Sequence, residues 1–264
     1  MKAIILAAGM GSRIRPLTDN CPKCLLKVGG KTILEMMLSH IQRCGINEVI
    51  FVLGYLQDQV RDYVKTAFPE LAATYLVNDN FATTNTGYSL MLALRETKDC
   101  AFVKFDADVV FDEEILRRLI DSEHENCLCI DKNIQLDAEE IKVTIEGDNK
   151  VVKVSKLVRP MDAIGESIGI EKINGHTAEL LLVELQKNML DVENHQNYYE
   201  DAYERLIANT VAFHALDISE LRWTEIDTHE DFATAEKIFR LPLSHEADRS
   251  PGGIQHSTAH SQGN

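Results

Sequence analysis

The sequence lacks the features that would suit a membrane protein or a nucleic-acid-binding protein. Its 264 residues contain no run of about eighteen apolar residues, so no helix is predicted to span a membrane. The apolar run near the start is too short for a signal peptide, and a cytoplasmic location is expected. Basic residues are scarce, since 27 lysines and arginines stand against 42 acidic residues and leave a formal net charge of −15. Binding to nucleic acid in general, or to an anionic membrane, needs a broad positive surface and is therefore not expected.

Regularly spaced cysteines are also absent. The six cysteines are Cys21, Cys24, Cys44, Cys100, Cys127 and Cys129. Without regular spacing they predict reduced thiols rather than a disulfide framework. Cys21 and Cys24 form a CxxC pair, but a structural zinc site needs a second pair, and Cys127 and Cys129 lie too close together for one. We interpret these residues as free thiols and keep a CxxC redox protein as the least favoured alternative.

Short apolar runs alternate with amphipathic stretches through the first half of the chain. Strands are predicted over 2–7, 48–53, 73–77, 101–105 and 127–130, and helices over 32–44, 58–68, 87–95 and 113–122. Thr32 and Glu35 form a capping-box pair at the start of the first helix, and Gly45 stops it. Strands that alternate with helices in this way indicate an α/β fold, with a mostly parallel sheet covered on both faces.

The second half of the chain has a different pattern. Apolar and polar residues alternate over 141–154 around the turn Gly147-Asp148-Asn149, which predicts a β-hairpin. Helices are then predicted over 177–190, 199–208 and 230–239, with a strand over 211–216. From about Ser244 the composition shifts to Ser, Gly, His and Gln without apolar periodicity. We therefore predict one domain over 1–243 and a disordered tail over 244–264.

A glycine-rich loop follows the first predicted strand, in the segment LAAGMGSRIRPLT and the Pro22-Lys23 pair after it. Such a loop lets backbone N–H groups approach a phosphate chain, and Arg13, Arg15 and Lys23 add positive charge. The loop lacks the GxxxxGK pattern of a Walker A loop, and Ile14 stands where a dinucleotide fingerprint needs its third glycine. The segment predicts an anion-binding cradle, and the alternative is a tight turn with incidental glycines.

This loop closely resembles the signature of the sugar-phosphate nucleotidyltransferase superfamily. The resemblance implies a Rossmann-like α/β domain that joins a nucleoside triphosphate to a phosphorylated small molecule and releases pyrophosphate. It also implies that this region binds the nucleotide, with Arg13 and Lys23 serving in catalysis as well. The residues assigned in this way are Leu6, Ala8, Gly9, Gly11, Ser12, Arg13 and Lys23.

Two carboxylates, Asp106 and Asp108, follow the buried strand that ends at Phe105. Alternation at a strand end aims both toward the crevice at the carboxyl edge of the sheet, and such oxygen ligands suit Mg²⁺. A solvated acidic turn is the alternative. The resemblance implies that Asp108 binds the metal and that Asp106 contacts the nucleotide. It implies a second metal ligand at Asp227, in the late segment WTEID, unless Asp227 merely caps the following helix.

The segment over 78–90, NDNFATTNTGYSL, indicates the branch of the superfamily. It resembles the cytidylyltransferases that act on phosphocholine and on phosphonates such as aminoethylphosphonate. An amide can both donate to and accept from a cytosine edge, so Asn85 and Ser89 are the base-reading candidates. The alternative is a polar loop in which Thr86 caps the next helix.

The acceptor half of the chain carries a weaker resemblance. Lys156 resembles the basic catalytic residue that meets the acceptor phosphate, and Lys142 is a weaker candidate because exposed hairpin lysines are common. The segment over 165–169 resembles the acceptor-side strand. The predicted acceptor-binding residues are Tyr88, Glu166, Tyr198, Glu200 and Asp201. Tyrosine faces and carboxylates attract a cationic amine, although the tyrosines could instead pack the core.

The expected activity is Mg²⁺-dependent transfer of CMP from CTP to a small phosphorylated or phosphonate acceptor, with release of pyrophosphate. The acceptor oxygen is already an anion near neutral pH, so no general base is required. Arg13, Arg15, Lys23, Lys156 and Arg159 would offset the net negative charge locally. A hexose- or inositol-1-phosphate acceptor and a nucleotide-binding regulator without catalysis remain alternatives. The oligomeric state stays open, and a homodimer is compatible with the sequence.

Overall fold

The computed structural model describes residues 1–98 and 100–240. The predicted tail over 244–264 lies outside the described residues, so the domain boundary stays a prediction. None of the helices in the described part of the chain is both long enough and apolar enough to cross a membrane.

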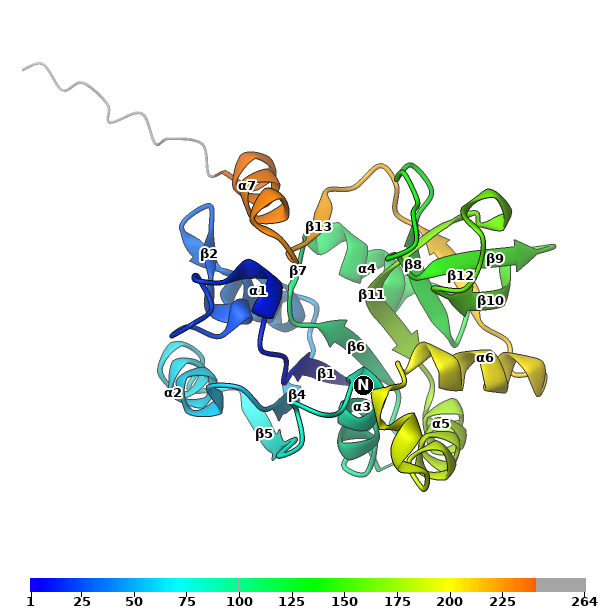
Figure 1. The fold of residues 1–264 in the computed structure, drawn as a ribbon, viewed down its shortest axis with the longest axis horizontal. Coiled ribbons are helices and arrows are strands. Elements are labelled where there is room, and N and C mark those ends of the chain that lie inside the picture. The colour runs from blue at the N-terminus through cyan, green and yellow to red at the C-terminus, as the bar shows by residue number, and fades with distance from the viewer. Residues whose placement is uncertain (99, 241–264) are drawn as a thin grey trace, which may run out of the picture.

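A nine-stranded sheet runs through the described residues in the order β5-β4-β1-β6-β11-β8-β12-β10-β9 (Figure 1). The strands are β1 (Lys2–Ala7), β4 (Glu48–Leu53), β5 (Ala72–Val77), β6 (Phe102–Asp106), β8 (Cys127–Asp131), β9 (Lys142–Glu146), β10 (Lys150–Ser155), β11 (Gly165–Ile173) and β12 (His214–Asp217). β1 pairs in parallel with β4 and β6, and β4 pairs in parallel with β5. β11 lies antiparallel between β6 and β8, so the sheet is mixed.

Helices cover both faces of this sheet. They are α1 (Ile33–Arg43), α2 (Gln57–Ala67), α3 (Thr86–Leu94), α4 (Glu113–Asp121), α5 (Gly175–Asn188), α6 (Glu200–Ala208) and α7 (His229–Ile238). Ala3 and Ile5 of β1 pack with α1, α2 and α4, whereas Ile4 and Leu6 pack with α3, α5 and α6. The alternation along β1 therefore separates two apolar layers, and the predicted α/β fold is confirmed.

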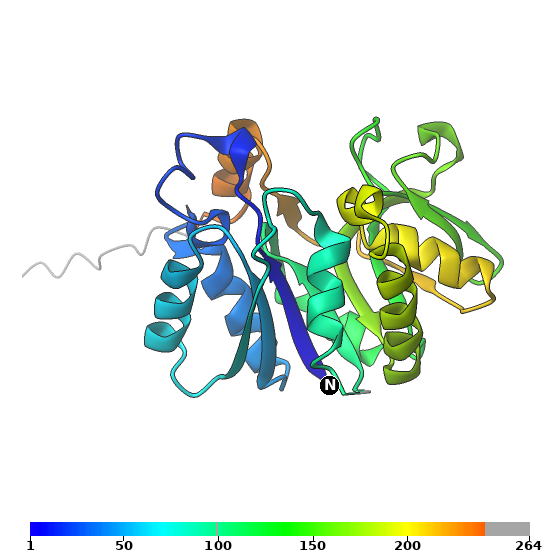
Figure 2. The same cartoon turned by 60° about the horizontal axis from the view of Figure 1, so that its bottom comes forward.

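Short elements complete the fold. Two small sheets pair β13 (Trp223–Glu225) with β7 (Val109–Phe111) and β2 (Lys27–Val28) with β3 (Lys31–Thr32). Single turns of 3₁₀-helix are η1 (Ser12–Ile14), η2 (Lys23–Leu25), η3 (Pro160–Asp162) and η4 (Val192–Gln196). Figure 2 shows the loop after β1 and helix α7 at the edge of the sheet opposite the N-terminus. This is the carboxyl edge of β1, where α/β proteins bind ligands.

Most predicted elements agree with the structure to within a few residues, including the hairpin of β9 and β10. At α1, Thr32 accepts from the backbone N–H of Glu35 as predicted, while the Glu35 carboxylate accepts from Tyr63. The main element that the pattern failed to predict in full is β11, which is buried along all nine residues. Glu166, Glu171 and Lys172 interrupt the apolar pattern of β11, so the sequence did not indicate a buried central strand there. All six cysteines are free thiols, as predicted.

Candidate active site

A cavity of about 670 Å³ opens at the carboxyl edge of β1 and β6. It collects predicted site residues from segments that lie far apart in the sequence. Those that line it are Leu6, Ala8, Gly9, Arg13, Asn85, Ser89, Asp106, Asp108, Lys156, Glu166, Tyr198, Glu200 and Asp227. Gly11, Ser12, Lys23, Tyr88 and Asp201 are not among its lining residues. The predicted binding residues therefore converge on one cavity, with a few of them placed around it.

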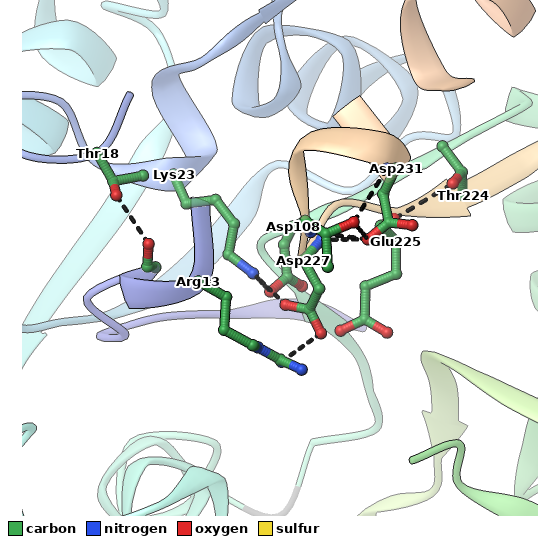
Figure 3. A network of polar contacts seen from close by, with 10 residues as sticks. Arg13, Thr18, Lys23, Asp108, Thr224, Glu225, Asp227 and Asp231 are labelled. Atoms are coloured by element: carbon green, nitrogen blue, oxygen red, sulfur yellow. Dashed lines mark hydrogen bonds and ion pairs between the residues drawn. The ribbon is translucent and has the colours of Figure 1, made fainter. Parts of the chain in front are cut away.

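The glycine loop turns sharply at Gly11, whose φ of +59° favours glycine. A Cβ there would lie 3.0 Å from the Thr18 side chain, and the Thr18 hydroxyl donates to the Gly11 carbonyl at 2.7 Å (Figure 3). Gly9 has nothing within 4 Å of its Cβ position, so the chain there stays open toward the cavity. Arg15 forms an ion pair with Asp19 at 3.3 Å and does not line the cavity.

Lys23 joins the two aspartates that the resemblance assigned to a metal. Its Nζ lies 2.6 Å from Asp108 Oδ2 and 2.7 Å from Asp227 Oδ1, and Arg13 contacts the other oxygen of Asp227 (Figure 3). Burial alone would lower the pKa of Lys23, but the charges of Asp108 and Asp227 outweigh it and raise that pKa. The lysine is thus firmly charged and holds the two carboxylates side by side.

Glu225 is a third carboxylate of this group, and sequence reasoning missed it. Asp108, Glu225 and Asp227 each offer an oxygen within 4.8 Å of the others. Pairing of β13 with β7 and a 3.1 Å bond from Ile226 N–H to the Asp108 carbonyl bring the segments together. The available signal was spacing, because Glu225 and Asp227 are two residues apart at a strand end, as Asp106 and Asp108 are.

The carboxylate group fits a hard divalent cation. Asp108 Oδ1 is buried and has no hydrogen-bond partner among the described residues. Three carboxylates supply the oxygen ligands that Mg²⁺ prefers. The alternative role for Asp227 is wrong, because Thr228 caps α7 and accepts from the Asp231 N–H. Asp227 is therefore not the capping residue, and its two oxygens contact Lys23 and Arg13 instead.

Asp106 points to a different set of partners from Asp108. It accepts from Lys104 Nζ and from the Tyr199 hydroxyl, each at 2.8 Å. Gly169 of β11 packs directly on it, since a Cβ there would lie 2.5 Å from Asp106 Oδ2. Both aspartates line the cavity, as expected. Their carboxylates nevertheless contact different groups.

A buried charged cluster beneath Asp106 was also missed from the sequence. Lys104 is fully buried in β6 and forms ion pairs with Glu171 of β11, at 2.9 Å, and with Asp106. Glu200 and Tyr199 lie beside it and are buried too. Burial raises the pKa of Glu171 to about 7 and that of Glu200 to about 8, and the Lys104 charge only partly offsets this effect. One lysine thus faces more carboxylates than it can neutralise.

The Asn-rich loop differs in one detail from the alternative in which Thr86 caps the next helix. Asn85, not Thr86, caps α3, because its Oδ1 accepts from the Thr86 N–H at 2.8 Å. Its Nδ2 donates to the Gln196 carbonyl at 3.3 Å. Asn78, which the sequence analysis did not single out, is buried in the cavity wall and donates to Ser89 Oγ at 3.1 Å. Asn78 therefore fixes the orientation of the predicted base-reading serine.

The acceptor half brings Lys156 and Tyr198 together. Lys156 Nζ lies 5.0 Å from the centre of the Tyr198 ring and 3.6 Å from Glu139. Tyr198 is partly exposed to the cavity, whereas Tyr199 is buried in the core at its wall. Tyr88 packs beside His195.

Two basic residues of this half lie away from the cavity. Arg159 bonds Asp162 on another surface. Lys142 is buried rather than exposed, and its Nζ donates to the carbonyls of Asp137 and Glu140 at 2.9 Å each. The expectation of an exposed Lys142 is therefore wrong, because the loop before β9 folds over its side chain.

Residues 3–138 match the MobA-like NTP transferase domain. The chain belongs to this family of nucleotidyltransferases. The chain is 28% identical over 253 residues to a CTP:phosphoglutamine cytidylyltransferase of Campylobacter jejuni, covering 88% of this chain and 97% of that one. It is 29% identical over 252 residues to a CMP-5'-(3-aminopropyl)phosphonate synthase of Streptomyces rubellomurinus, covering 92% of this chain and 39% of that one.

A solved CTP:phosphocholine cytidylyltransferase from Streptococcus pneumoniae has a similar structure. The TM-score is 0.72 at 26% identity, over 90% of this chain and 98% of that chain. The resemblance to sugar-phosphate nucleotidyltransferases and the transferase class are therefore confirmed. Further neighbours below 25% identity support the fold alone.

Proposed function

We propose that this protein moves CMP from CTP to an oxygen of a small, amine-bearing phosphorylated or phosphonate acceptor and releases pyrophosphate. One observation carries the proposal: a single cavity combines Arg13 and the Asp108–Glu225–Asp227 group with Lys156 and a wall of acidic side chains. The cationic part suits the phosphates, and the acidic wall suits an amine rather than a neutral sugar. The relatives above are named for CTP or CMP chemistry on phosphorylated or phosphonate compounds.

Positive charge at the reaction centre is supplied by side chains and by a metal. Asp108, Glu225 and Asp227 would hold Mg²⁺, which supplies charge neutralisation at the phosphates when bound. Arg13 is assigned to the triphosphate and Lys156 to the acceptor phosphorus group, so that two mutually repelling anions meet in the cavity. Lys23 keeps the aspartates in position. No side chain needs to remove a proton, because the attacking oxygen is already ionised.

The nucleotide base is assigned to the wall that Asn85 and Ser89 form. Both residues line the cavity, and Asn78 orients the Ser89 hydroxyl. The glycine loop, with Leu6, Ala8 and Gly9 in the wall, is assigned to the nucleotide beside it. The acceptor is assigned to Tyr198, Glu166 and Glu200 at the acidic wall.

The test is a panel of ATP, GTP, CTP and UTP against phosphocholine, 2-aminoethylphosphonate, glucose-1-phosphate and inositol-1-phosphate, scored by pyrophosphate release with Mg²⁺. The proposal predicts turnover with CTP and an amine-bearing acceptor. Preference for a sugar or inositol phosphate would contradict the acceptor class, and preference for another nucleotide would contradict the assignment of CTP. Absence of release with every pair would favour a nucleotide-binding regulator.

A further inference from the structure

We infer that the acidic wall of the cavity selects an acceptor whose amine carries N–H groups, a primary ammonium, over a trimethylammonium. Glu166 is the residue that makes this distinction. The inference rests on the proposed transfer to an amine-bearing acceptor and narrows it to one class of amine.

Glu166 has a buried carboxyl group that faces the cavity without a hydrogen-bond partner among the described residues. It is 7% exposed on β11 and lines the cavity, and its Oε2 has no hydrogen-bond partner within the described part of the chain. The strand register sets it beside Asp131 of β8 and Lys142 of β9. Lys142 does not satisfy it, because its ammonium donates to the carbonyls of Asp137 and Glu140. Buried carboxylates without donors are rare, so a ligand is the natural source of one.

The groups around Glu166 are mostly acidic. Burial, together with the charges of Glu140, Asp131 and Asp137, raises the pKa of Glu166 to about 8, although Lys142 partly opposes this. Asp131 accepts from the Trp223 indole N–H at 2.8 Å, which fixes it in the wall. Glu166 thus keeps its proton near neutral pH in the free protein, and a bound cation beside it would favour the ionised carboxylate by lowering that pKa.

A second carboxyl group on the cavity wall, that of Glu200, is also buried and without a hydrogen-bond donor from the described part of the chain. Glu200 is 5% exposed, and its Oε2 has no hydrogen-bond partner among residues 1–98 and 100–240. Lys104, the nearest cation, is engaged by Asp106, Glu171 and the Tyr199 hydroxyl. The wall is thus short of hydrogen-bond donors.

A primary ammonium supplies what this wall needs, and a trimethylammonium does not. The first carries three N–H donors, as a lysine ammonium does. The second carries none and is recognised through open aromatic faces. Here the face of the Tyr198 ring already has the Lys156 ammonium 5.0 Å from its centre. Leaving a buried carboxylate without its donor would weaken binding by roughly 10- to 100-fold.

Phosphoethanolamine and phosphocholine test this inference, because they differ only in three methyl groups. Trp223 is the only tryptophan of the sequence and lies in the cavity wall, so its fluorescence reports binding without turnover. Wild-type protein is expected to bind phosphoethanolamine roughly 10- to 100-fold more tightly, and to show the same preference in kcat/KM with CTP. In Glu166→Gln the preference should fall to a few-fold, while Glu146→Gln, on the exposed end of β9, should keep it.

The mono- and dimethyl derivatives separate hydrogen bonding from size in the wild-type protein, without any variant. Affinity should drop most at the third methyl group, which removes the last N–H. The inference would be overturned if affinity declined evenly with each methyl group, or if phosphoethanolamine and phosphocholine bound equally well or not at all. An unchanged preference in Glu166→Gln would overturn it too. Selective binding without pyrophosphate release would support the inference and overturn the proposed function. Pyrophosphate release without selectivity between the amines would support the proposed function and overturn the inference.

Discussion

The ammonium group of Lys104 lies 2.9 Å from a carboxylate oxygen of Glu171, and neither side chain reaches solvent. The two residues are directly opposite on the antiparallel strands β6 and β11. β6 carries Asp106 to the cavity, and Lys104 bonds that aspartate as well. An ion pair inside the sheet therefore holds one wall of the site in place.

Removing one partner of this pair should be strongly destabilising. Lys104→Met leaves the buried Glu171 and the half-buried Asp106 without their cation, and a loss of about 3–5 kcal/mol in the free energy of unfolding is expected in urea denaturation. Adding Glu171→Gln should recover part of the loss. Lys187→Met removes the ion pair that this exposed lysine forms with Glu184 at the surface, and it should cost below about 1 kcal/mol. Equal losses in the two single variants would contradict the role of burial.

The free energy of unfolding should fall as pH rises from the pKa of Glu166 in the unfolded chain to its pKa in the folded protein. Its pKa is about 8 in the folded protein, and an unfolded glutamate titrates near 4.3, about its reference value. Between these values the folded state keeps a proton that the unfolded chain releases, so rising pH favours unfolding. Glu166→Gln should match wild-type stability near pH 4 and exceed it by on the order of 1–3 kcal/mol near pH 8.5. A difference that does not change with pH in urea melts would refute this assignment.

Lys23 and a bound metal should substitute for each other in stabilising the aspartates. Lys23→Met leaves Asp108 and Asp227 without the ammonium that now lies 2.6 and 2.7 Å away. We expect a lower Tm in EDTA and a larger rise in Tm on adding Mg²⁺ than in wild type, because the ion restores the missing charge. The measurement is differential scanning fluorimetry with an MgCl₂ titration. Identical shifts in both proteins would argue against a metal at these carboxylates.

Asn78 should act on the nucleotide rather than on the acceptor. Its side-chain amide donates to Ser89 and Thr84, and its Oδ1 accepts from the Asn80 N–H. Asn78→Ala is expected to raise KM for CTP roughly tenfold, with a small change in KM for the acceptor. The exposed Asn80→Ala should leave both unchanged. Initial rates with each substrate varied in turn decide this, and a selective rise in the acceptor KM would contradict it.

The elements that were predictable from the sequence are those whose apolar residues repeat with a clear period. β1, β4 and α1 have such patterns, and their bounds agree closely. β11 was hard to find because Glu171 and Lys172 lie within it, and Lys104 neutralises Glu171 from 67 positions away in the chain. Local periodicity carries no information about such a partner.

Site residues that belong to a recognisable sequence motif were predictable. Residues that only the fold brings to the site were not. The glycine loop, Asp108 and Asp227 reach one cavity, as the resemblance implied. Glu225 joins them only because β13 pairs with β7, a pairing of two three-residue strands. Lys142 looked like an exposed hairpin lysine, yet two backbone carbonyls before β9 hold it in the interior.

The most direct test of the central claim follows CTP and 2-aminoethylphosphonate by ³¹P NMR with Mg²⁺. Wild type, Asp108→Asn, Asp227→Asn and the control Asp148→Asn, in the exposed turn between β9 and β10, would be compared. We expect wild type and Asp148→Asn to form pyrophosphate and a CMP conjugate at equal rates. In Asp108→Asn and Asp227→Asn the rate of formation should fall by at least roughly 100-fold. Turnover within a few-fold of wild type in Asp108→Asn or Asp227→Asn would contradict it.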